Sequence, residues 1–458
     1  MSGPDAPPWP SPPSDVGGAG PGGGVRRELG GGLVLRAARA DDRDGVVALN
    51  EAAFGVQDGA AVASVFEPGS DVEWLVVARE EDGGRAPGPV VGACCRIPHR
   101  FRLDGVAVPG SQIEFVATDP SVRGRGLVRA MFARHHARAA ELGEQLQVIG
   151  GIPYYYRKLG YGYAIDYPPL VVMEPAALPP LDPSVTVRPA RPDDIAALAA
   201  LDAPSDDVGL VIERDAGVWR RWLSRTASSA PPDAPGMGLG DDGAWEALLL
   251  AERSGTVVGW LRLQVYVDEA QVHLLPGPVP DADVGGQLLA RAHQAVDHLA
   301  GSVLGRAVEI LTTDRPGSAW ARVLAVTGHR RDVPTGIYGR TADELGLLRR
   351  LEPVLSRRLA ASQLAGDRGE VVVSLYERAL RLGWSDGRVS TLEACPADPD
   401  PFDNGQVGVA PDWFPALVLG RWGASELAAR VDDVQLGRHA AVMDVLFPPR
   451  PADLVADL

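Results

Sequence analysis

Two stretches of this chain begin in the same way, and this internal repeat constrains the fold more than any other feature. The first, LVLRAARADDRDGVVALNEAAFG, starts at residue 33 and places a short apolar strand, an arginine and an Asp-Asp pair before an amphipathic helix. The second, VTVRPARPDDIAALAALDA, repeats this order at residues 185–203, about 150 residues later. In both, aspartate stands where a helix N-cap is favoured, and apolar residues recur at helical spacing. The repeat predicts two copies of one domain rather than a single large fold.

The rest of the chain divides around these copies. Residues 1–29 are rich in proline and glycine, so they cannot bury enough apolar surface to offset their ordering entropy, and we predict a disordered tail. We assign the two copies to residues 30–180 and 184–341, with the Pro-rich PPLDPS between them. Residues 342–458 combine helical patterns with the strand-like EVVVSLYERALRLGW and are predicted to form a separate α+β domain. The predicted fold class is therefore mixed α+β.

Charge and composition exclude several classes of function. The 44 basic and 60 acidic residues leave a net charge of −16, which argues against a nucleic-acid partner and is compatible with cationic substrates such as amines. No apolar run approaches the ~18 residues of a membrane span, and the first residues lack the pattern of a secretory signal. We therefore expect a cytoplasmic protein without a membrane partner. The three cysteines and eight histidines show no metal-ligand spacing, so no metal is expected.

The stretch IEFVATDPSVRGRGLVRAMFARHHARAAELG, residues 113–143, carries the most chemical information. An apolar strand leads through a Pro-containing turn into Arg123-Gly124-Arg125-Gly126, and an amphipathic helix follows. Such an arrangement presents free backbone N–H groups at the positive end of a helix dipole, where a pyrophosphate can bind. A dinucleotide fingerprint would need glycine in place of Arg129, and a P-loop would need Gly-Lys-Ser/Thr. A plain surface turn with arginines is the alternative for this short signal.

Six of the nine tyrosines lie between residues 154 and 167, in GGIPYYYRKLGYGYAIDY. One interpretation is an aromatic core patch. The other is chemical, because a phenol with a reference pKa of ~10 can donate a proton. Next to a phosphate-binding turn, this pattern indicates an acyl-CoA site.

These residues resemble those of the GNAT acetyltransferase superfamily. The family's acetyl-CoA loop follows Arg/Gln-x-x-Gly-x-Gly/Ala, and here Arg123, Gly126 and Val128 occupy the defined positions. Val128 in the last position, the following GLVRAM and the phrase YYRKLGYG resemble the Eis-like (enhanced intracellular survival) branch. The resemblance is specific in the first domain and architectural in the rest of the chain after residue 30.

The resemblance implies two tandem GNAT domains with mixed sheets flanked by helices, followed by a sterol-carrier-like domain. The phrases PFDNGQVGVAPDWFPALVLGRW and AAVMDVLFPPRP resemble that last module, for which packing and assembly are expected ahead of a lipid cargo. The second GNAT copy is degenerate, because LLPGPVPDADVGGQLL replaces the Gly-rich turn and carries Asp281 and Asp283, which would repel a pyrophosphate. The resemblance also implies a homo-oligomer, with a hexamer as the family's usual assembly.

Acetyl-CoA is the implied acyl donor. Strand residues 116–118 would pair with the pantetheine arm, residues 124–129 would hold the pyrophosphate, and residues 151–152 would line the thioester cleft. The implied contacts are Val116, Ala117, Thr118, Gly124, Arg125, Gly126, Leu127, Val128, Arg129, Gly151 and Ile152.

The resemblance also implies the catalytic groups. Tyr156 matches the family's proton donor, which would protonate the leaving CoA thiolate. The C-terminal carboxylate of Leu458 is the implied base for the amine, although the ending ADLVADL lacks an aromatic residue, and Glu114 is the alternative base.

The predicted function is transfer of acetyl from acetyl-CoA to a primary amine of a polyamine- or aminoglycoside-like molecule or of a lysine side chain. The alternatives are transfer of another acyl group to a biosynthetic intermediate and a non-catalytic protein that binds CoA or lipid.

Overall fold

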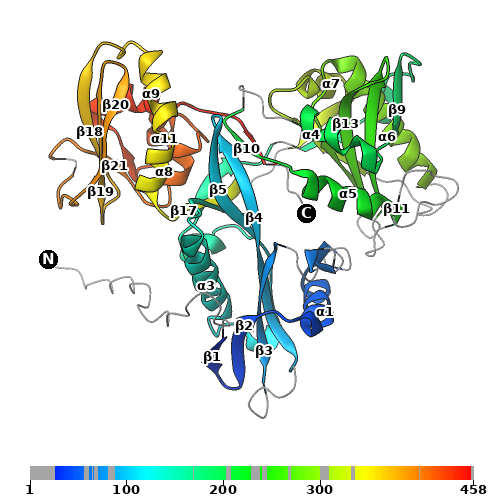
Figure 1. Cartoon of the computed structure of the whole chain (residues 1–458), viewed down its shortest axis with the longest axis horizontal. Helices are drawn as coiled ribbons and strands as arrows, with labels where there is room; N and C mark the ends of the chain where they lie inside the picture. Colours follow the sequence, from blue (N-terminus) through cyan, green and yellow to red (C-terminus); the bar gives the residue numbers. More distant parts are fainter. Residues whose placement is uncertain are drawn as a thin grey trace.

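The computed structural model describes residues 26–55, 61–63, 65–66, 71–80, 88–168, 170–202, 208–227, 238–239, 245–266, 270–299, 309–331, 336–401 and 403–454. Its elements form three groups, each built on one sheet (Figure 1). The predicted tail lies mostly outside these residues, and Arg26–Gly30 at its end forms strand β1. No helix in the described ranges is long and apolar enough to cross a membrane. The mixed α+β fold class is confirmed.

The first module consists of a mixed sheet and two long helices, α1 (Arg43–Phe54) and α3 (Leu127–Glu141). Its long hairpin β4–β5 rises between the two upper groups of elements in Figure 1. The β5–β6 pair is parallel, whereas the other pairs along the main path are antiparallel. In spatial order the strands are β1 (Arg26–Gly30), β2 (Leu33–Ala37), β3 (Glu73–Arg79), β4 (Val90–Leu103), β5 (Val106–Thr118), β6 (Leu146–Ile149), β17 (Gly336–Thr341) and β7 (Gly162–Asp166).

Alternating side chains of this sheet form two separate cores. On one face Trp74 and Cys95 pack in the cluster that contains α1, and on the other Leu75 and Cys94 pack in the cluster that contains the start of α3. Successive strand residues point to opposite faces, so these apolar runs can bury both faces of the sheet. The helices thus hold the middle of β4 and β5 from both sides.

The second module has a sheet of eight strands covered by α4 (Ile195–Leu201) and α5 (Ala216–Ala227) in one apolar cluster and by α6 (Ala282–Leu299) and α7 (Trp320–Thr327) in another. In spatial order its strands are β11 (Gly238–Leu239), β12 (Trp245–Arg253), β13 (Thr256–Tyr266), β14 (Gln271–Pro276), β15 (Glu309–Thr313), β8 (Leu170–Met173) and β16 (Gly328–Arg331), with β9 (Val185–Pro189) paired to β12.

The third module combines a five-stranded sheet with short helices. Its strands in spatial order are β20 (Arg388–Cys395), β19 (Ala379–Ser385), β18 (Arg368–Ser374), β21 (Val407–Val409) and β22 (Val434–Gln435). Its helices are α8 (Glu344–Arg350), α9 (Glu352–Ala360), α10 (Phe414–Val418), α11 (Ala424–Arg430) and α12 (Ala440–Leu446). The described single-turn 3₁₀ elements of the chain are η1 (Ala40–Asp42), η2 (Pro120–Val122), η3 (Tyr155–Leu159), η4 (Pro175–Ala177), η5 (Pro192–Asp194) and η7 (Gly437–His439).

Strands near the predicted boundaries pair across them. Strand β8, which precedes residue 180, lies in the second sheet between β15 and β16. Strand β17, which ends at Thr341, lies in the first sheet between β6 and β7. Strand β10 (Leu210–Ile212) pairs with the last residues of β4, and β23 (Ala452–Asp453) pairs in turn with β10, so both add to the first sheet. The domain boundaries at residues 180–184 and 341 stay a prediction. In the structure, the segment before residue 180 gives β8 to the second sheet, and the segment before residue 341 gives β17 to the first sheet.

The sequence repeat has a structural counterpart. Arg36 donates from Nη1 and Nη2 to the two carboxylate oxygens of Asp42, at 2.6 and 2.8 Å. Arg188 makes the same pair of bonds to Asp194, both at 2.8 Å. Both aspartates also accept the backbone N–H three residues earlier, which closes the turn into the following helix. The repeated Arg and Asp residues thus form the same strand-to-helix junction twice.

Candidate active site

The parallel strands β5 and β6 separate partway along their length. Their pairing spans only Gly110–Gln112 opposite Leu146–Val148, after which β6 ends at Ile149 while β5 continues to Thr118. A cavity of about 640 Å³ opens beside the diverging strand ends. Its wall consists of Ala53, Phe54, Val116, Ala117, Thr118, Val122, Arg123, Gly124, Gly126, Leu127, Val128, Arg129, Ile152, Tyr155, Tyr156, Lys158 and Leu159.

A β-bulge in β5 lies at this separation. Glu114 pairs with Cys95 and Ala117 with Ala93, so one residue of β4 opposes two residues of β5. Phe115 takes up the extra length with a φ of 54°, a left-handed conformation that is strained for a bulky residue. Its ring stacks on Trp74, with centroids 5.8 Å apart, which anchors the bulge to the core. The bulge interrupts the β4–β5 ladder beside Val116, where the predicted pantetheine contacts begin.

The Gly-rich turn leads from η2 directly into α3. Gly124 and Gly126 have φ values of 76° and 77°, and Gly126 is the N-cap of α3. A Cβ at either position would meet nothing within 4 Å, so the left-handed backbone rather than lack of space favours glycine. Arg123 and Arg129 line the cavity, whereas Arg125 turns away and donates from Nη2 to the Gly30 carbonyl at 3.0 Å. The turn therefore offers a helix N-terminus flanked by two guanidinium groups, which suits an anion.

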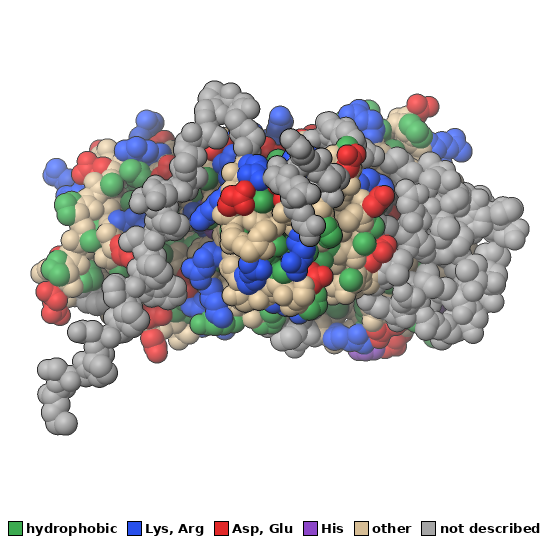
Figure 2. Space-filling view, turned by 90° about the horizontal axis from the view of Figure 1, so that it is seen from below, with side chains coloured by type: hydrophobic (Ala, Val, Ile, Leu, Met, Phe, Trp, Pro, Cys, Tyr) green, Lys and Arg blue, Asp and Glu red, His purple; other side chains and the backbone are tan. Residues whose placement is uncertain are grey.

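Nine of the eleven predicted cofactor contacts line this cavity; Arg125 and Gly151 are the two that do not. Gly151, with φ 123°, lies against Tyr156, because a Cβ there would lie 3.3 Å from the Tyr156 ring. Figure 2 views the molecule from the lower side of Figure 1. Among the described residues on that face, basic side chains gather around the centre. Phe54 and Ile152, 49% and 60% exposed, add apolar surface to the cavity wall.

Tyr156 belongs to a buried aromatic cluster. Its ring stacks on Phe132 of α3 at 5.7 Å and meets the edge of Tyr338 at 5.6 Å. Burial raises the pKa of Tyr156, and the nearby charge of Glu114 acts in the same direction, so the hydroxyl stays protonated at neutral pH. Tyr156 therefore packs in an aromatic core and also lines the cavity, and its role as a proton donor stays a prediction.

Tyr338 was not among the predicted site residues. It lies on β17, and its hydroxyl is within 2.7 Å of the Tyr163 hydroxyl and donates to the Ile152 carbonyl at 3.2 Å. It thereby holds the segment that lines the cavity. Local sequence contains no signal for this contact, because β17 follows the whole second module.

The two candidate bases differ in what the structure describes. Glu114 accepts a hydrogen bond from Gln112 Nε2 at 2.6 Å, and Gln112 Oε1 lies 3.0 Å from His99 Nε2. The Glu114 charge also contributes to the raised pKa of Tyr167. Leu458 lies outside the described residues, which end at Leu454.

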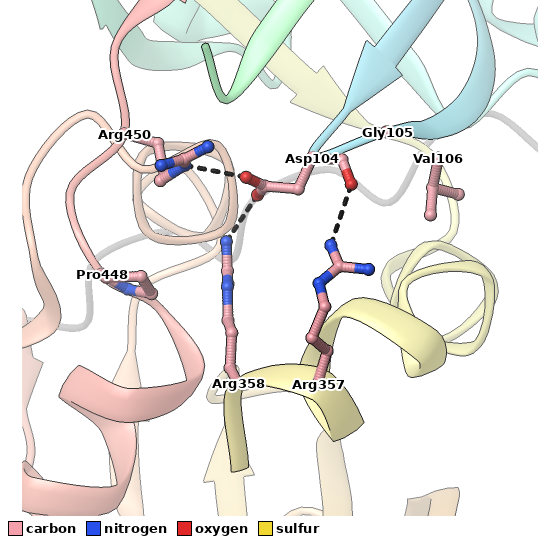
Figure 3. A pocket seen from close by; sticks show the side chains of 7 residues that line it. All are labelled: Asp104, Gly105, Val106, Arg357, Arg358, Pro448 and Arg450. Carbon is pink, nitrogen blue, oxygen red and sulfur yellow. Dashed lines mark hydrogen bonds and ion pairs between the residues drawn. The ribbon is translucent and has the colours of Figure 1, made fainter. Parts of the chain in front are cut away.

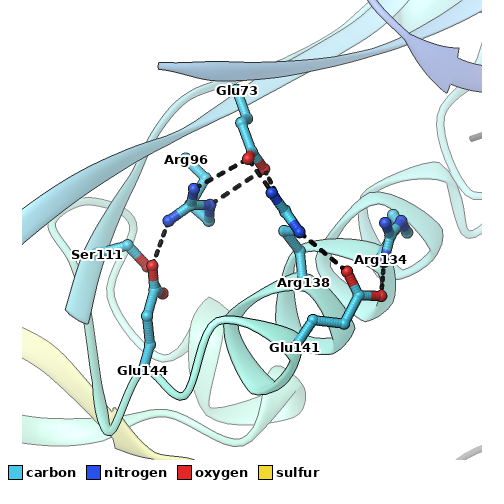
Figure 4. Close-up of polar contacts among 7 residues, drawn as sticks. All are labelled: Glu73, Arg96, Ser111, Arg134, Arg138, Glu141 and Glu144. Carbon is cyan, nitrogen blue, oxygen red and sulfur yellow. Dashed lines mark hydrogen bonds and ion pairs between the residues drawn. The ribbon is translucent and has the colours of Figure 1, made fainter. Parts of the chain in front are cut away.

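Ion pairs and hydrogen bonds hold the C-terminal half of α3 and the turn that follows it against the sheet (Figure 4). Arg96 of β4, only 3% exposed, bonds both Glu144 and Glu73, and Glu73 also pairs with Arg138 of α3 at 3.0 Å. Ser111 of β5 donates to Glu144 at 2.6 Å. Burial tends to raise the pKa of Glu73, but the hydrogen bonds and charges of the two arginines lower it overall.

His135 lies on the buried side of α3, and its burial should make the stability of the protein depend on pH. Burial lowers its pKa from 6.5 to about 3, so the unfolded chain binds a proton below pH 6.5 that the folded chain does not. Between pH 7 and 5 this difference costs about 2 kcal/mol of the free energy of unfolding. We expect urea unfolding to show a smaller loss of stability over that range in His135→Leu. Equal losses in the two proteins would contradict the buried neutral imidazole.

The corresponding junction of the second module offers no such turn. The N-terminus of α6 is capped by Asp281, whose Oδ1 accepts the Val284 N–H at 3.0 Å and whose Oδ2 pairs with Arg253 at 2.6 Å. A Cβ at Gly286 would lie 2.9 Å from Pro179, so the backbone there is already covered. A carboxylate thus occupies the position that an anion would take at this helix N-terminus, and the absence of CoA binding by this copy stays a prediction.

The described residues contain no group of three or more His, Cys, Asp or Glu side chains arranged to hold a metal ion.

Comparisons with known proteins agree with this geometry. Residues 34–164 match the family described as acetyltransferase (GNAT) domain. The chain is 34% identical over 146 residues to the N-acetyltransferase Eis of Mycobacterium tuberculosis, an alignment that covers 31% of this chain and 35% of that protein. The match thus spans about a third of the length of this curated relative.

Solved structures resemble the chain over nearly its whole length. A conserved protein from Enterococcus faecalis described as a probable N-acyltransferase has a TM-score of 0.63 at 13% identity, covering 93% of this chain and 99% of its own. Eis1 from Mycobacterium abscessus has a TM-score of 0.56 at 16% identity over the same shares. At these identities the likeness concerns the fold alone. Residues 34–164 of this chain are therefore similar to the acetyltransferase (GNAT) domain, within an overall fold similar to that of Eis1.

Proposed function

We propose that the protein transfers the acetyl group of acetyl-CoA directly to a primary amine. The observation that carries this proposal is the single cavity shared by the Gly-rich turn, the diverging end of β5 and the buried Tyr156. These three features supply an anion site, a groove for an extended arm and a proton donor. The GNAT domain match covers all three.

In the proposed complex, the CoA pyrophosphate lies at the N-terminus of α3, near Arg123 and Arg129. The pantetheine arm follows Val116–Thr118, just after the bulge, where β5 has no pairing with β6. The thioester then lies between the ends of β5 and β6, next to Gly151 and Tyr156. Lys158, which also lines the cavity, adds positive charge for the nucleotide phosphates.

The amine nitrogen attacks the acetyl carbonyl carbon, and the carbon–sulfur bond of the thioester breaks. The CoA thiolate leaves and takes the hydroxyl proton of Tyr156, whose raised pKa keeps that proton in place until the thiolate forms. The ammonium proton of the amine passes to a carboxylate, since an alkyl ammonium with pKa ~10 has no lone pair at neutral pH. The second proton that the nitrogen loses as the amide forms returns to the Tyr156 oxygen, and the carboxylate releases its proton to solvent. The products are an N-acetyl amine and free CoA.

We propose the Leu458 carboxylate as this acceptor, with Glu114 as the alternative. Strand β23 runs parallel to β10, and β10 runs antiparallel to β4 from Leu103 to Phe101. The described strand β23 therefore runs along β4 in the direction of His99 and Gln112. Four residues can extend over ~14 Å, which supports an approach of the terminal carboxylate to the site.

The two candidate bases predict loss of activity in different variants. Removal of residues 455–458 is expected to lower turnover about 100-fold or more while acetyl-CoA still binds, because the acceptor for the amine proton is lost. Glu114→Gln, which keeps the shape and the hydrogen bond to Gln112, is the matched comparison. Steady-state kinetics of both variants, together with a direct measurement of their acetyl-CoA affinity, distinguish the two candidate bases. Full turnover in the truncated protein with loss in Glu114→Gln would assign the base to Glu114 instead.

The function is tested by release of CoA thiol from acetyl-CoA with polyamines, aminoglycosides and lysine peptides as acceptors. Turnover with any of these amines supports the transferase and defines its acceptor class. Tight acetyl-CoA binding without turnover on the panel would favour the alternatives, either another acyl donor or acceptor or a CoA-binding protein. Thermal stabilisation by acyl-CoAs of different chain length distinguishes these, since ligands of the folded state raise its apparent stability.

The remaining expectations concern assembly. The third module is α+β, and its likeness to sterol carrier proteins stays a prediction, as does a homo-oligomer or hexamer. Sedimentation of the full chain tests the assembly.

A further inference from the structure

A second cavity lies at the far end of the β4–β5 hairpin from the candidate active site. Its volume is about 640 Å³, and its wall is formed by the hairpin turn, by α9 and by the segment after α12 (Figure 3). The lining residues are Asp104, Gly105, Val106, Arg357, Arg358, Pro448 and Arg450. Three arginines and one aspartate leave this wall with a formal surplus of two positive charges.

The arginines converge on one residue. Arg358 Nη2 bonds Asp104 Oδ2 at 2.5 Å, and Arg450 Nε bonds Asp104 Oδ1 at 2.7 Å. Arg357 donates from Nη2 to the backbone carbonyl of Asp104 at 3.1 Å. Both carboxylate oxygens of Asp104 are thus engaged, and Arg357 has no carboxylate partner among the ion pairs of the described residues.

The site is rigid on the side of Asp104 and Arg450. Asp104 donates its backbone N–H to the Gly209 carbonyl at 2.7 Å, and Arg450 donates its own to Gly420 at 2.8 Å. A Cβ at Gly209 would lie 2.4 Å from Arg450 Cβ, and one at Gly420 would lie 2.9 Å from it. The guanidinium groups are therefore presented from a fixed backbone, so little ordering would oppose the binding of a ligand.

The cations also crowd one another. Burial lowers the pKa of Arg358, the charges of Arg450 and Arg357 act in the same direction, and Asp104 opposes them. An added anion would relieve this repulsion. A guanidinium offers five donors in a planar fork that matches carboxylate and phosphate oxygens.

We propose that this cavity binds a small oxyanion with two negative charges, either a phosphate monoester or a dicarboxylate. The charge of such a ligand matches the surplus of the wall, and the volume admits a small organic molecule rather than a bare ion. The site is separate from the CoA cavity and does not depend on the proposed reaction.

Inorganic phosphate and succinate, titrated into the full-length protein, test the proposal. Arg357→Gln removes one cation from an exposed position with only a backbone contact, so the fold should be retained. Its matched control is Arg349→Gln on α8, an exposed arginine that also donates to a backbone carbonyl, that of Leu392, away from the cavity. We expect at least one probe to bind, Arg357→Gln to weaken it about tenfold, and Arg349→Gln to leave it unchanged. Arg357→Lys should fall between, because it keeps the charge without the fork.

The stronger of the two probes identifies the ligand class. Sodium chloride at matched ionic strength controls for general screening, and Arg129→Gln controls for phosphate bound at the Gly-rich turn. If neither probe binds more tightly than chloride, or if Arg129→Gln weakens binding while Arg357→Gln does not, the proposed site is wrong.

Discussion

Replacing Tyr156 by phenylalanine is expected to lower turnover between about 100-fold and 10,000-fold, the range typical of a lost general acid. The reason is the leaving group. Without the hydroxyl, the CoA thiolate must leave without a proton from Tyr156, the buried phenol in the cavity wall. Binding of acetyl-CoA should change little, because the ring still stacks on Phe132 and still lines the cavity.

Tyr161→Phe is the matched control for that variant. Tyr161 lies in the same aromatic cluster, and its hydroxyl is 3.1 Å from His136 Nε2, but it does not line the cavity. Its loss should affect stability more than turnover. Comparable turnover in wild type and Tyr156→Phe would remove Tyr156 from the mechanism. The raised pKa of Tyr156 also predicts that raising the pH from 7 to 9 does not remove its proton, so any loss of activity in that range has another source.

The second large effect concerns stability and compares the two copies of the repeat. Asp42→Asn should lower the free energy of unfolding by about 3–5 kcal/mol, because Arg36, at 3% side-chain exposure, then loses its main counter-charge in the interior. Asp194→Asn breaks the equivalent ion pair of the second copy, in which the side chains of Arg188 and Asp194 are 22% and 13% exposed. Because water screens this pair more, we expect the free energy of unfolding to fall by only about 1–2 kcal/mol. Urea unfolding of both variants measures the difference, with exposed Asp41→Asn as a control near zero. Equal losses at Asp42 and Asp194 would contradict burial as the cause.

The contribution of the Arg36–Asp42 ion pair to stability should also depend on pH. Burial opposes the charge on Asp42, but its hydrogen bonds to Arg36 and to the Arg39 backbone lower its pKa overall. A lowered pKa in the folded state contributes stability above the unfolded value near 4, and this contribution is lost as the pH falls through the folded value. The Asn variant should therefore lose less stability than wild type on acidification below pH 4.

The sequence predicted features that depend on local pattern. The repeated arginine and Asp-Asp pair correspond to equivalent junctions, since capping and bidentate pairing require only neighbouring residues. The turn at Gly124 and Gly126 was predicted for the same reason. Strand partners were not, because the choice of partner for β8 or β17 depends on competition among many apolar strands. The direction of the Arg125 side chain also escaped prediction, since its acceptor is the distant Gly30 carbonyl.

Residues that reach the site from elsewhere in the chain were missed for the same physical reason. Phe54 ends α1 and is simply an apolar residue at the end of an amphipathic helix, with no local sign that it borders a cavity. Tyr338 comes from a strand that reads as part of the second copy. Its contact with Ile152 requires the sheet order β6–β17–β7, which no local periodicity encodes.

The insertion of β17 between β6 and β7 has a consequence for biosynthesis. Because about 170 residues separate β7 from β17, the ribosome needs ~10–35 s at ordinary elongation rates to supply the strand that joins them. During that interval the nascent first module exposes two unpaired strand edges beside the tyrosine-rich segment, where chaperones or neighbouring chains can bind. Expression of residues 30–180 alone would make that transient state permanent, so a soluble fragment of the first module needs the strand Gly336–Thr341 supplied in cis or as a peptide.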